Sequence, residues 1–478
     1  MYETAIGMEV HLELCTRSKV FCGCSTNYGG APNSQACPVC LGLPGSLPVL
    51  NKRAVEFAIK ASLALNCEVA PETKFDRKNY FYPDLVKGYQ ISQYDKPIGR
   101  NGYIEFEVEG VTRRVGIRRV HLEEDTGKSF HDVAAERTYL DFNRSGVPLI
   151  EIVTEPDIRS SAEAKSYLEA LREIMAYIEV SDCRIEEGSM RCEANISIRP
   201  TGSSDYGILN EIKNIGSLRG VQRALEYEIK RQTELVSSGG IVLRQTRRWN
   251  ESELKTEVMR TKEEAHDYRY FPEPDLLQLV IDNSWLNQCR SEIPELPRAR
   301  RERYVRELGI TPYDAEELVA DRALAQYFEG VARLGTEPKL AANWLLSDLR
   351  RELNQASLAI EQVKLREAGF SELMVLVSSG AIGSKTAKEI LGELVHSGVS
   401  PAAYVKEKGL AQLSDTSEIE KFVEQAIADS PKIVADYRVG KERALTALVG
   451  VVMKLSRGKA KPELVNDLLT QKLNKGRL

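Results

Sequence analysis

The chain has 478 residues, of which 42% are hydrophobic and 28% charged, and its formal net charge is −5. This composition is that of a soluble globular protein, and no stretch is long and apolar enough to predict a membrane span. One core rarely fills a chain of this length, so we expect two or three domains. The N-terminus opens in a strand pattern rather than a basic-then-apolar signal segment, so we expect a cytoplasmic protein with reduced cysteines.

The first part of the chain, to about residue 290, has the pattern of a mixed α+β domain. Alternating apolar and polar residues predict strands over residues 6–14, 103–108, 115–120, 149–153 and 192–199. Apolar residues at helical spacing predict helices over residues 52–65 and 162–178. Turn signals, such as Asn101 followed by Gly102, separate the strands and favour an antiparallel sheet.

Beyond Pro294 and Pro297 the strand patterns fade and helical patterns take over, as over residues 340–353. We therefore expect three domains: an α+β domain over residues 1–292, an all-helical domain over 293–408 and a small helical tail domain over 409–478. The tail is basic although the whole chain is acidic, since residues 441–478 contain nine basic and three acidic side chains. A nucleic acid partner explains this excess, and so does a solvated helical face.

The sharpest local signal is a pattern of four cysteines: Cys22 and Cys24, then twelve residues, then Cys37 and Cys40. Two close thiol pairs separated by a short loop can meet tetrahedrally around one zinc ion. Four thiolates leave no open coordination position, so we expect a structural zinc rather than a catalytic one. The alternative is a set of unrelated buried thiols, which is what we expect of the other five cysteines.

Acidic side chains recur on the polar faces of the predicted strands. The candidates are Glu9, His11 and Glu13 on the first strand, Glu123 and Glu124 where another ends, Glu151, and Glu193 with Asn195. If these strands are neighbours in one sheet, they form an oxygen-rich wall suited to Mg²⁺. A solvated outer face explains any single strand equally well. Glu151 resists that explanation best, because a carboxylate inside an apolar run is costly to bury without a partner.

Residues 73–84 combine cations with aromatic rings. Arg77 and Lys78 precede the aromatic run at residues 80–82, and Pro83 closes it. Cations beside rings suit a phosphate or base site, although aromatic clusters also serve as simple core packing.

Several other sites are excluded by the residues present. Gly127-Lys128-Ser129 looks like the end of a phosphate loop, but position 122 is Leu where that loop needs Gly, and no dinucleotide-binding glycine fingerprint occurs. Ser203 and Ser204 lie in a predicted turn with no nearby lysine, and residue 2 is Tyr rather than a glutaminase cysteine. The chain is therefore not expected to make its own ammonia.

Six motifs together resemble one family. In order, they are IGMEVHLEL, FDRKNYFYPDLVKGYQISQYD, HLEEDTGKS, SGVPLIEIVTEPD, EEGSMRCEANIS and DYRYFPEPD. They closely resemble the B subunits of the aspartyl/glutamyl-tRNA(Asn/Gln) amidotransferases, and the resemblance runs over essentially the whole chain. It implies a cradle-shaped N-terminal domain, a helical domain and a helical tail that binds tRNA.

The resemblance also implies a reaction. ATP phosphorylates the side-chain carboxylate of a glutamate or aspartate misacylated onto tRNA, and ammonia then displaces phosphate to give the amide. A free carboxylate does not react with ammonia, because its leaving group would be oxide. The transfer gathers negative charge, so metal ions and a basic group must neutralise it.

By the same resemblance, His11, Glu124 and Glu151 are expected to bind Mg²⁺, with Glu9 close by. Histidine is an unusual ligand for Mg²⁺, so Mn²⁺ could take the place of Mg²⁺, or a water molecule could lie between the histidine and the ion. Strict alternation along the strand instead places Glu123 on the polar face. We follow the family here and assume that the strand ends before this pair.

Lys78 is the expected contact of the transferred phosphate, Arg77 a second contact for ATP, and Glu193 and Arg191 are expected to complete the catalytic site. The resemblance further implies a heterotrimer, in which an amidase (A) subunit supplies ammonia through a channel and a small C subunit clamps the pair. Two other functions remain open at this point, a non-catalytic tRNA-binding scaffold and a metal-dependent hydrolase. A scaffold would bind tRNA without ATP turnover, and a hydrolase would turn over without tRNA or amidase.

Overall fold

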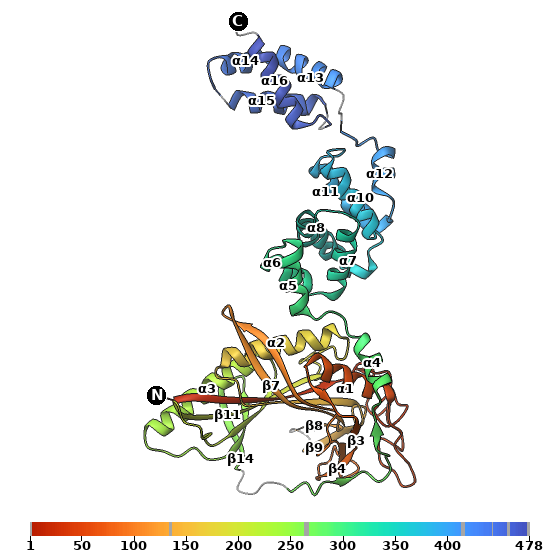
Figure 1. Cartoon of the computed structure of the whole chain (residues 1–478), viewed down its shortest axis with the longest axis vertical. Helices are drawn as coiled ribbons and strands as arrows, with labels where there is room; N and C mark the ends of the chain where they lie inside the picture. Colours follow the sequence, from red (N-terminus) through yellow and green to blue (C-terminus); the bar gives the residue numbers. More distant parts are fainter. Residues whose placement is uncertain are drawn as a thin grey trace. The chain divides into compact units, whose positions relative to one another are not determined.

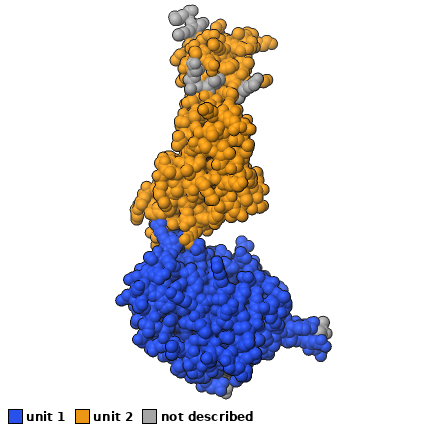
Figure 2. Space-filling model, turned by 90° about the vertical axis from the view of Figure 1, so that its right-hand side faces the viewer, with its two compact units in different colours: residues 1–297 blue, residues 298–478 orange. Residues whose placement is uncertain are grey.

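The structure is a computed structural model that describes residues 2–132, 136–261, 267–412, 416–441, 443–456 and 459–475. The chain divides into two compact units, Met1–Pro297 and Arg298–Leu478 (Figure 2). Among the described residues, the first unit contains the sheets together with four helices, and the helices and strands assigned in the second unit are all helices. The expected α+β class is thereby confirmed. The finer division into domains at residues 292 and 408 remains a prediction.

A nine-stranded sheet organises the first unit (Figure 1). Its order is β14-β13-β12-β11-β1-β10-β7-β6-β2. The bounds are β1 (Tyr2–Glu13), β2 (Glu68–Val69), β6 (Gly99–Val108), β7 (Val111–Glu124), β10 (Pro148–Thr154), β11 (Met190–Pro200), β12 (Asn210–Ile215), β13 (Gln245–Asn250) and β14 (Lys255–Thr261). All five predicted strands lie within this sheet.

The sheet is antiparallel as expected, except for one pair. β12 and β13 run parallel, with Glu211 opposite Thr246. A parallel pair needs a crossover connection, and the helix α3 (Leu218–Ser237) lies between these two strands in the chain.

One face of the sheet is apolar and covered by helices. Met8, Val10 and Leu12 of β1 are fully buried, as are Ile150 and Ile152 of β10. They share one core cluster with apolar residues of α1 (Lys52–Ala64), α2 (Ser161–Tyr177) and α3, and these helices contact the strands. Because side chains alternate along a strand, the intervening residues of β1 and β10 face the opposite side of the sheet. That side is where the polar candidates lie.

Three smaller sheets complete the first unit. β4 (Asp76–Asn79) lies between β5 (Tyr89–Ser92) and β15 (Phe271–Pro272), while β3 (Glu72–Thr73) pairs with β16 (Leu279–Val280) and β8 (Lys128–Asp132) with β9 (Arg137–Asp141). In the first of these sheets Phe271 is paired with Arg77, so two segments distant in sequence lie side by side. The helix α4 (Asn283–Ser291) follows these strands in the chain.

The second unit contains helices α5 to α16. Their bounds are α5 (Pro297–Leu308), α6 (Pro312–Val319), α7 (Arg322–Arg333), α8 (Pro338–Trp344), α9 (Arg350–Ala356), α10 (Glu367–Ser378), α11 (Ser384–Ser397), α12 (Pro401–Glu407), α13 (Thr416–Asp429), α14 (Pro431–Arg438), α15 (Arg443–Leu455) and α16 (Pro462–Lys475). A π-helical turn at Leu345–Leu349 joins α8 to α9 within the helix predicted at residues 340–353. Helices α13 to α16 share a core that includes Val423, Leu448 and Leu469. Within the described ranges, no helix is both long and apolar enough to cross a bilayer.

Candidate active site

A polar cavity of about 450 Å³ lies on the face of the large sheet opposite the core helices. Side chains of β1, β7, β10, β11 and β12 line it, together with residues of the small sheet that contains β4. Its volume falls within the range that small-molecule sites occupy.

Strand register brings four titratable side chains together at the centre of this cavity. His11 of β1 is paired with Glu151 of β10, which is paired in turn with His121 of β7. Glu123 lies two residues further along β7 and therefore on the same face. The Nε2 atom of His11 lies 3.4 Å from Glu151 and 3.6 Å from Glu123, and that of His121 lies 3.1 Å from Glu151. These four residues are called the His–Glu cluster below.

Both carboxylates of the His–Glu cluster are ionised in spite of burial. Glu123 is 2% exposed and Glu151 is 7% exposed. Burial alone would raise the pKa of Glu151, but His121 and His11 hold this pKa well below its usual range. Burial would lower the pKa of His121, yet Glu151 and Glu123 raise it to about 9. Since a metal-binding imidazole must be neutral, a cation entering between these groups would displace a proton.

The donor set of the His–Glu cluster fits a divalent cation. His11, Glu123 and Glu151 offer ligand atoms that all lie within 4.8 Å of one another. Two carboxylates and one imidazole suit Mn²⁺, or Mg²⁺ that keeps several water ligands.

Glu124 lies on the opposite face of β7 from the His–Glu cluster. Its carboxylate accepts hydrogen bonds from the Lys87 ammonium and from the Ile91 backbone N–H at 2.8 Å, and it lines a smaller, separate cavity. Strand β7 runs through Glu124, so alternation continues to its last residue. The structure therefore brings Glu123, rather than Glu124, to His11 and Glu151.

A second acidic group lines the same cavity. Ligand atoms of Glu9, Glu193 and Glu211 lie within 4.8 Å of one another. Lys213 bridges two of them, with its ammonium 2.5 Å from Glu193 and 3.1 Å from Glu211, and Asn195 donates a hydrogen bond to Glu9 at 2.7 Å. Lys213 thus offsets part of the charge of the three carboxylates, and burial together with the neighbouring carboxylates raises the pKa of Glu9. Lys213 was not predicted, because its role depends on the register of β12 against β11.

Lys78 of β4 presents a cation to the cavity. Its ammonium lies 5.0 Å from the ring centre of Tyr268 and 5.8 Å from that of Tyr80. No carboxylate of the described residues forms an ion pair with it, and it has no hydrogen-bond partner among them. Burial would lower the pKa of Lys78, but Glu123 and other groups across the cavity raise it, so the side chain remains charged.

The other two predicted cations are already paired. Arg77 is on the opposite face of β4, where its guanidinium forms two hydrogen bonds to Glu273, at 2.6 and 2.8 Å, and lies 4.1 Å from the Tyr89 ring centre. It does not line the cavity that contains Lys78. Arg191 does line it, and its guanidinium lies 2.9 Å from Asp125.

His121 is the main site residue that sequence reasoning missed. The signal was present, because His121 stands two residues before Glu123 on a strand and alternation puts both on one face. His121 was not among the predicted site residues.

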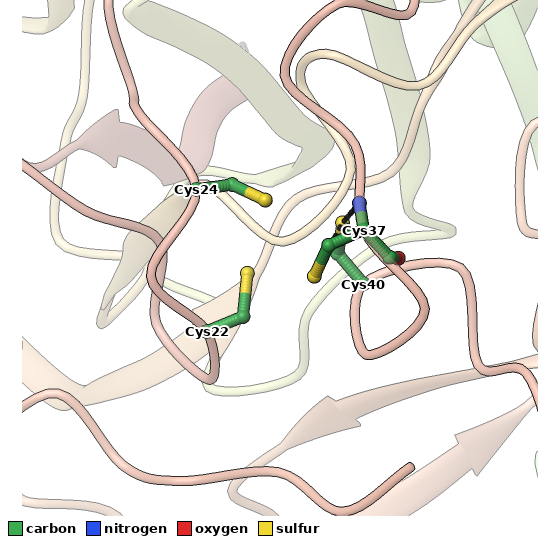
Figure 3. Close-up of side chains that lie close together, drawn as sticks. All are labelled: Cys22, Cys24, Cys37 and Cys40. Carbon is green, nitrogen blue, oxygen red and sulfur yellow. Dashed lines mark hydrogen bonds between the residues drawn. The ribbon is translucent and has the colours of Figure 1, made fainter.

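The four cysteines of the predicted zinc site lie close together, as Figure 3 shows. The sulfur atoms of Cys22, Cys24, Cys37 and Cys40 all lie within 4.8 Å of one another, and those of Cys37 and Cys40 are 3.8 Å apart. Two thiolates on a tetrahedral zinc ion with bonds of about 2.3 Å would be about 3.8 Å apart. Lys19, fully buried, lies 3.7 Å from the sulfur of Cys40.

The cysteines of the group differ in protonation: the hydrogen bond to Cys40 raises the pKa of Cys22, and burial raises the pKa of Cys24 to about 11. A hydrogen bond from Cys22, with further contributions from Cys37 and Lys19, lowers the pKa of Cys40 to about 4. Four of the five remaining cysteines are buried as expected. Cys15, which lies two residues beyond the end of β1, is exposed instead.

Comparison with known proteins identifies relatives along nearly the whole chain. The profile of the GatB/GatE catalytic domain matches residues 4–287, and that of the GatB domain matches residues 326–473. The chain is 54% identical over 477 residues to the B subunit of the aspartyl/glutamyl-tRNA(Asn/Gln) amidotransferase of Carboxydothermus hydrogenoformans, covering 99% of each protein. It is 53% identical over 473 residues to the protein of the same name from Brevibacillus brevis, again covering 99% of each.

The placement of Glu123 and Glu124 predicts different effects on metal binding. Glu123→Gln should weaken Mn²⁺ binding about 10-fold or more, because it removes a charged oxygen from the His–Glu cluster. Glu124→Gln should change the affinity less than about 2-fold, since this residue faces the other cavity. Titration followed by electron paramagnetic resonance measures both affinities, and the reverse order of effects would show that Glu124 is the ligand.

The cysteine geometry predicts one zinc ion per chain in metal analysis of the purified protein. Cys37→Ser should remove this zinc and lower the Tm of the first unit by about 5–10 °C, because a structural metal contributes to folding. Cys15→Ser is the matched control and should change neither quantity. Mn²⁺ affinity should be unaltered in both variants. A zinc-free protein of unchanged stability would contradict a structural role.

Proposed function

This chain belongs to the family of aspartyl/glutamyl-tRNA(Asn/Gln) amidotransferase B subunits, as its six motifs predicted, and we propose that the sheet cavity is the enzyme's kinase and transamidation site. The chain is one component of a glutamine-hydrolysing carbon–nitrogen ligase that acts in translation. It takes part in the ATP-dependent conversion of Glu-tRNA(Gln) or Asp-tRNA(Asn) to the amidated aminoacyl-tRNA.

The unpaired ammonium of Lys78, in one cavity with the His–Glu cluster, is the observation that carries the site assignment. Lys78 is half-buried in the cavity, and a cation there that forms no ion pair with a carboxylate of the described residues is available for an anionic substrate. The phosphates of ATP match this requirement, and the ionised carboxylates opposite would hold the cation that accompanies them.

The residues of the cavity have different roles in the proposed phosphoryl transfer. His11, Glu123 and Glu151 would hold a divalent ion, Mg²⁺ or Mn²⁺, which when bound supplies charge neutralisation on the phosphates. Lys78 stabilises the charge of the phosphoryl group during transfer, acting as a fixed positive charge in a partly buried site. Arg191, held by Asp125, and Lys213, held by Glu193, keep further positive charge at the cavity wall.

The chemistry proceeds in two steps on the substrate. An oxygen of the misacylated side-chain carboxylate attacks the γ-phosphorus of ATP, the bond to ADP breaks, and an acyl phosphate results. Ammonia then attacks the acyl carbon, the bond to phosphate breaks, and the nitrogen loses a proton to give the amide and inorganic phosphate. Phosphorylation supplies the leaving group that a free carboxylate lacks.

The two alternative functions are less well supported. A tRNA-binding scaffold with a solvated acidic face predicts exposed carboxylates, whereas Glu123 and Glu151 are almost completely buried beside histidines. A metal-dependent hydrolase would need no unpaired Lys78 opposite its metal ligands.

The proposed reaction needs ammonia and a misacylated tRNA, and both imply partners for this chain. An amidase (A) subunit would supply ammonia, and a small C subunit would complete a heterotrimer in the cytoplasm, where thiols remain reduced. The helical tail domain at residues 409–478, with its excess of basic residues, would bind the misacylated tRNA. The zinc ion at the four cysteines would be a structural support of the cradle domain at residues 1–292.

The site assignment predicts that Glu151→Gln abolishes catalysis without abolishing tRNA binding. In the complex with the amidase, Glu-tRNA(Gln) should stimulate ATP hydrolysis by the wild type, and the substitution should lower this rate at least about 100-fold. The affinity for tRNA, measured by filter binding, should change less than about 2-fold. Glu155→Gln, in an exposed ion pair just beyond the same strand, is the matched control and should retain activity. Undiminished turnover in Glu151→Gln would place phosphoryl transfer elsewhere.

A further inference from the structure

Four tyrosines line the same cavity as Lys78, and the function proposed above does not use them. Tyr80 follows β4, Tyr94 follows β5, and Tyr268 and Tyr270 immediately precede β15. Two regions that are far apart in sequence, residues 80–94 and 268–270, thus contribute rings to one cavity. None of the four belongs to the described hydrophobic core, so core packing does not explain them.

The backbone around these rings is held firmly. Asn79 donates from its backbone N–H to the carbonyl of Tyr268 at 3.0 Å and from its side-chain amide to the carbonyl of Arg269 at 2.8 Å. Beyond the rings, the bidentate pair of Arg77 with Glu273 fixes β15 against β4. The segment that carries Tyr268 and Tyr270 is therefore held against β4 by hydrogen bonds and an ion pair.

The rings themselves form an open stack. Tyr94 and Tyr270 lie parallel, with centroids 4.2 Å apart and an interplanar angle of 11°. Tyr268 meets Tyr270 edge-on, at 6.1 Å and 71°. Tyr94 is 55% exposed, although burial of a ring this size is strongly favourable. A stacked pair left accessible in a polar cavity offers a flat surface to a planar ligand.

The surroundings indicate which planar ligand fits. The tyrosine surface is uncharged, since burial raises the pKa of Tyr270 to about 12. Next to it lie the unpaired Lys78 ammonium, which suits phosphate, and the His–Glu cluster, which suits a divalent cation. A flat base joined to phosphates and a metal ion is a nucleotide.

We propose that Tyr94 and Tyr270 form a shelf on which an adenine ring stacks, with Tyr268 closing one side. This inference rests on the proposed function and identifies the part of the site that recognises the base. Two substrates of the reaction carry adenine, namely ATP and the 3′-terminal adenosine of tRNA. Lys78, 5.0 Å from the ring centre of Tyr268, is close enough to this shelf to contact the phosphates of such a nucleotide.

The test compares the binding of a nucleotide with the binding of a phosphate chain that has no base. Calorimetry with the full chain in complex with its amidase measures the binding of Mg-ATP and of Mg-tripolyphosphate. Tyr270→Ala should weaken ATP binding about 10-fold and leave tripolyphosphate binding within about 2-fold, because only ATP has a base to stack. Tyr270→Phe keeps the ring and should restore ATP affinity. Tyr139→Ala, an exposed tyrosine of β9 outside the cavity, is the control.

Tyr94→Ala provides a second variant on an independent segment and should show the same selective loss. Unchanged ATP affinity with an approximately 10-fold higher KM for misacylated tRNA, again rescued by phenylalanine, supports the shelf and identifies the tRNA terminus as its ligand. Unchanged values for both substrates overturn the shelf. A wild-type complex that binds no ATP instead contradicts the proposed function, so the two failures are distinguishable.

Discussion

The register of three central strands is the constraint on which the rest of the site depends. The pairing of β1, β10 and β7 places His11, Glu151 and His121 opposite one another on a single face. Because side chains alternate, a slip of one residue in any of these strands would turn its polar residues into the helix-covered core. The fully buried Met8, Val10 and Leu12 oppose such a slip. The apolar side of the sheet thus determines the chemistry of its polar side.

The register of these strands gathers charged side chains at buried positions of the cavity. Glu123 and Glu151 are retained as carboxylates because histidines lie beside them, and Lys213 offsets part of the charge of the neighbouring acidic group. The exception is Lys78, a cation whose close partners among the described residues are tyrosine rings. A site that combines such a cation, a divalent-metal donor set and stacked rings is matched to a metal-bound nucleotide rather than to a neutral ligand. The four cysteines form a separate group in the same unit, for which we propose a structural role.

Sequence patterns predicted those features that depend on residues close together in the chain. Alternation located the five strands and the polar face of β1, and cysteine spacing located the thiol group. Alternation along β7 also favoured Glu123 as the metal ligand. The family resemblance led us to choose Glu124 instead, but the carboxylate of Glu124 faces Lys87. Lys213 and the tyrosines near β15 were not predicted, because their positions depend on long-range pairing. Phe271 is paired with Arg77 although about two thirds of the first unit's sequence separates them, and no local pattern indicates that contact.

The central claim is that this enzyme activates the substrate carboxylate by phosphorylating it. Its most direct test is to follow oxygen from Glu-tRNA(Gln) whose side-chain carboxylate carries ¹⁸O in both positions. The wild-type complex, supplied with ATP and glutamine, should release inorganic phosphate with one ¹⁸O atom and leave the other in the amide, since the acyl phosphate breaks at its acyl carbon. Unlabelled phosphate at full amidation would show that ATP cleavage is not coupled through the carboxylate, and would contradict this account.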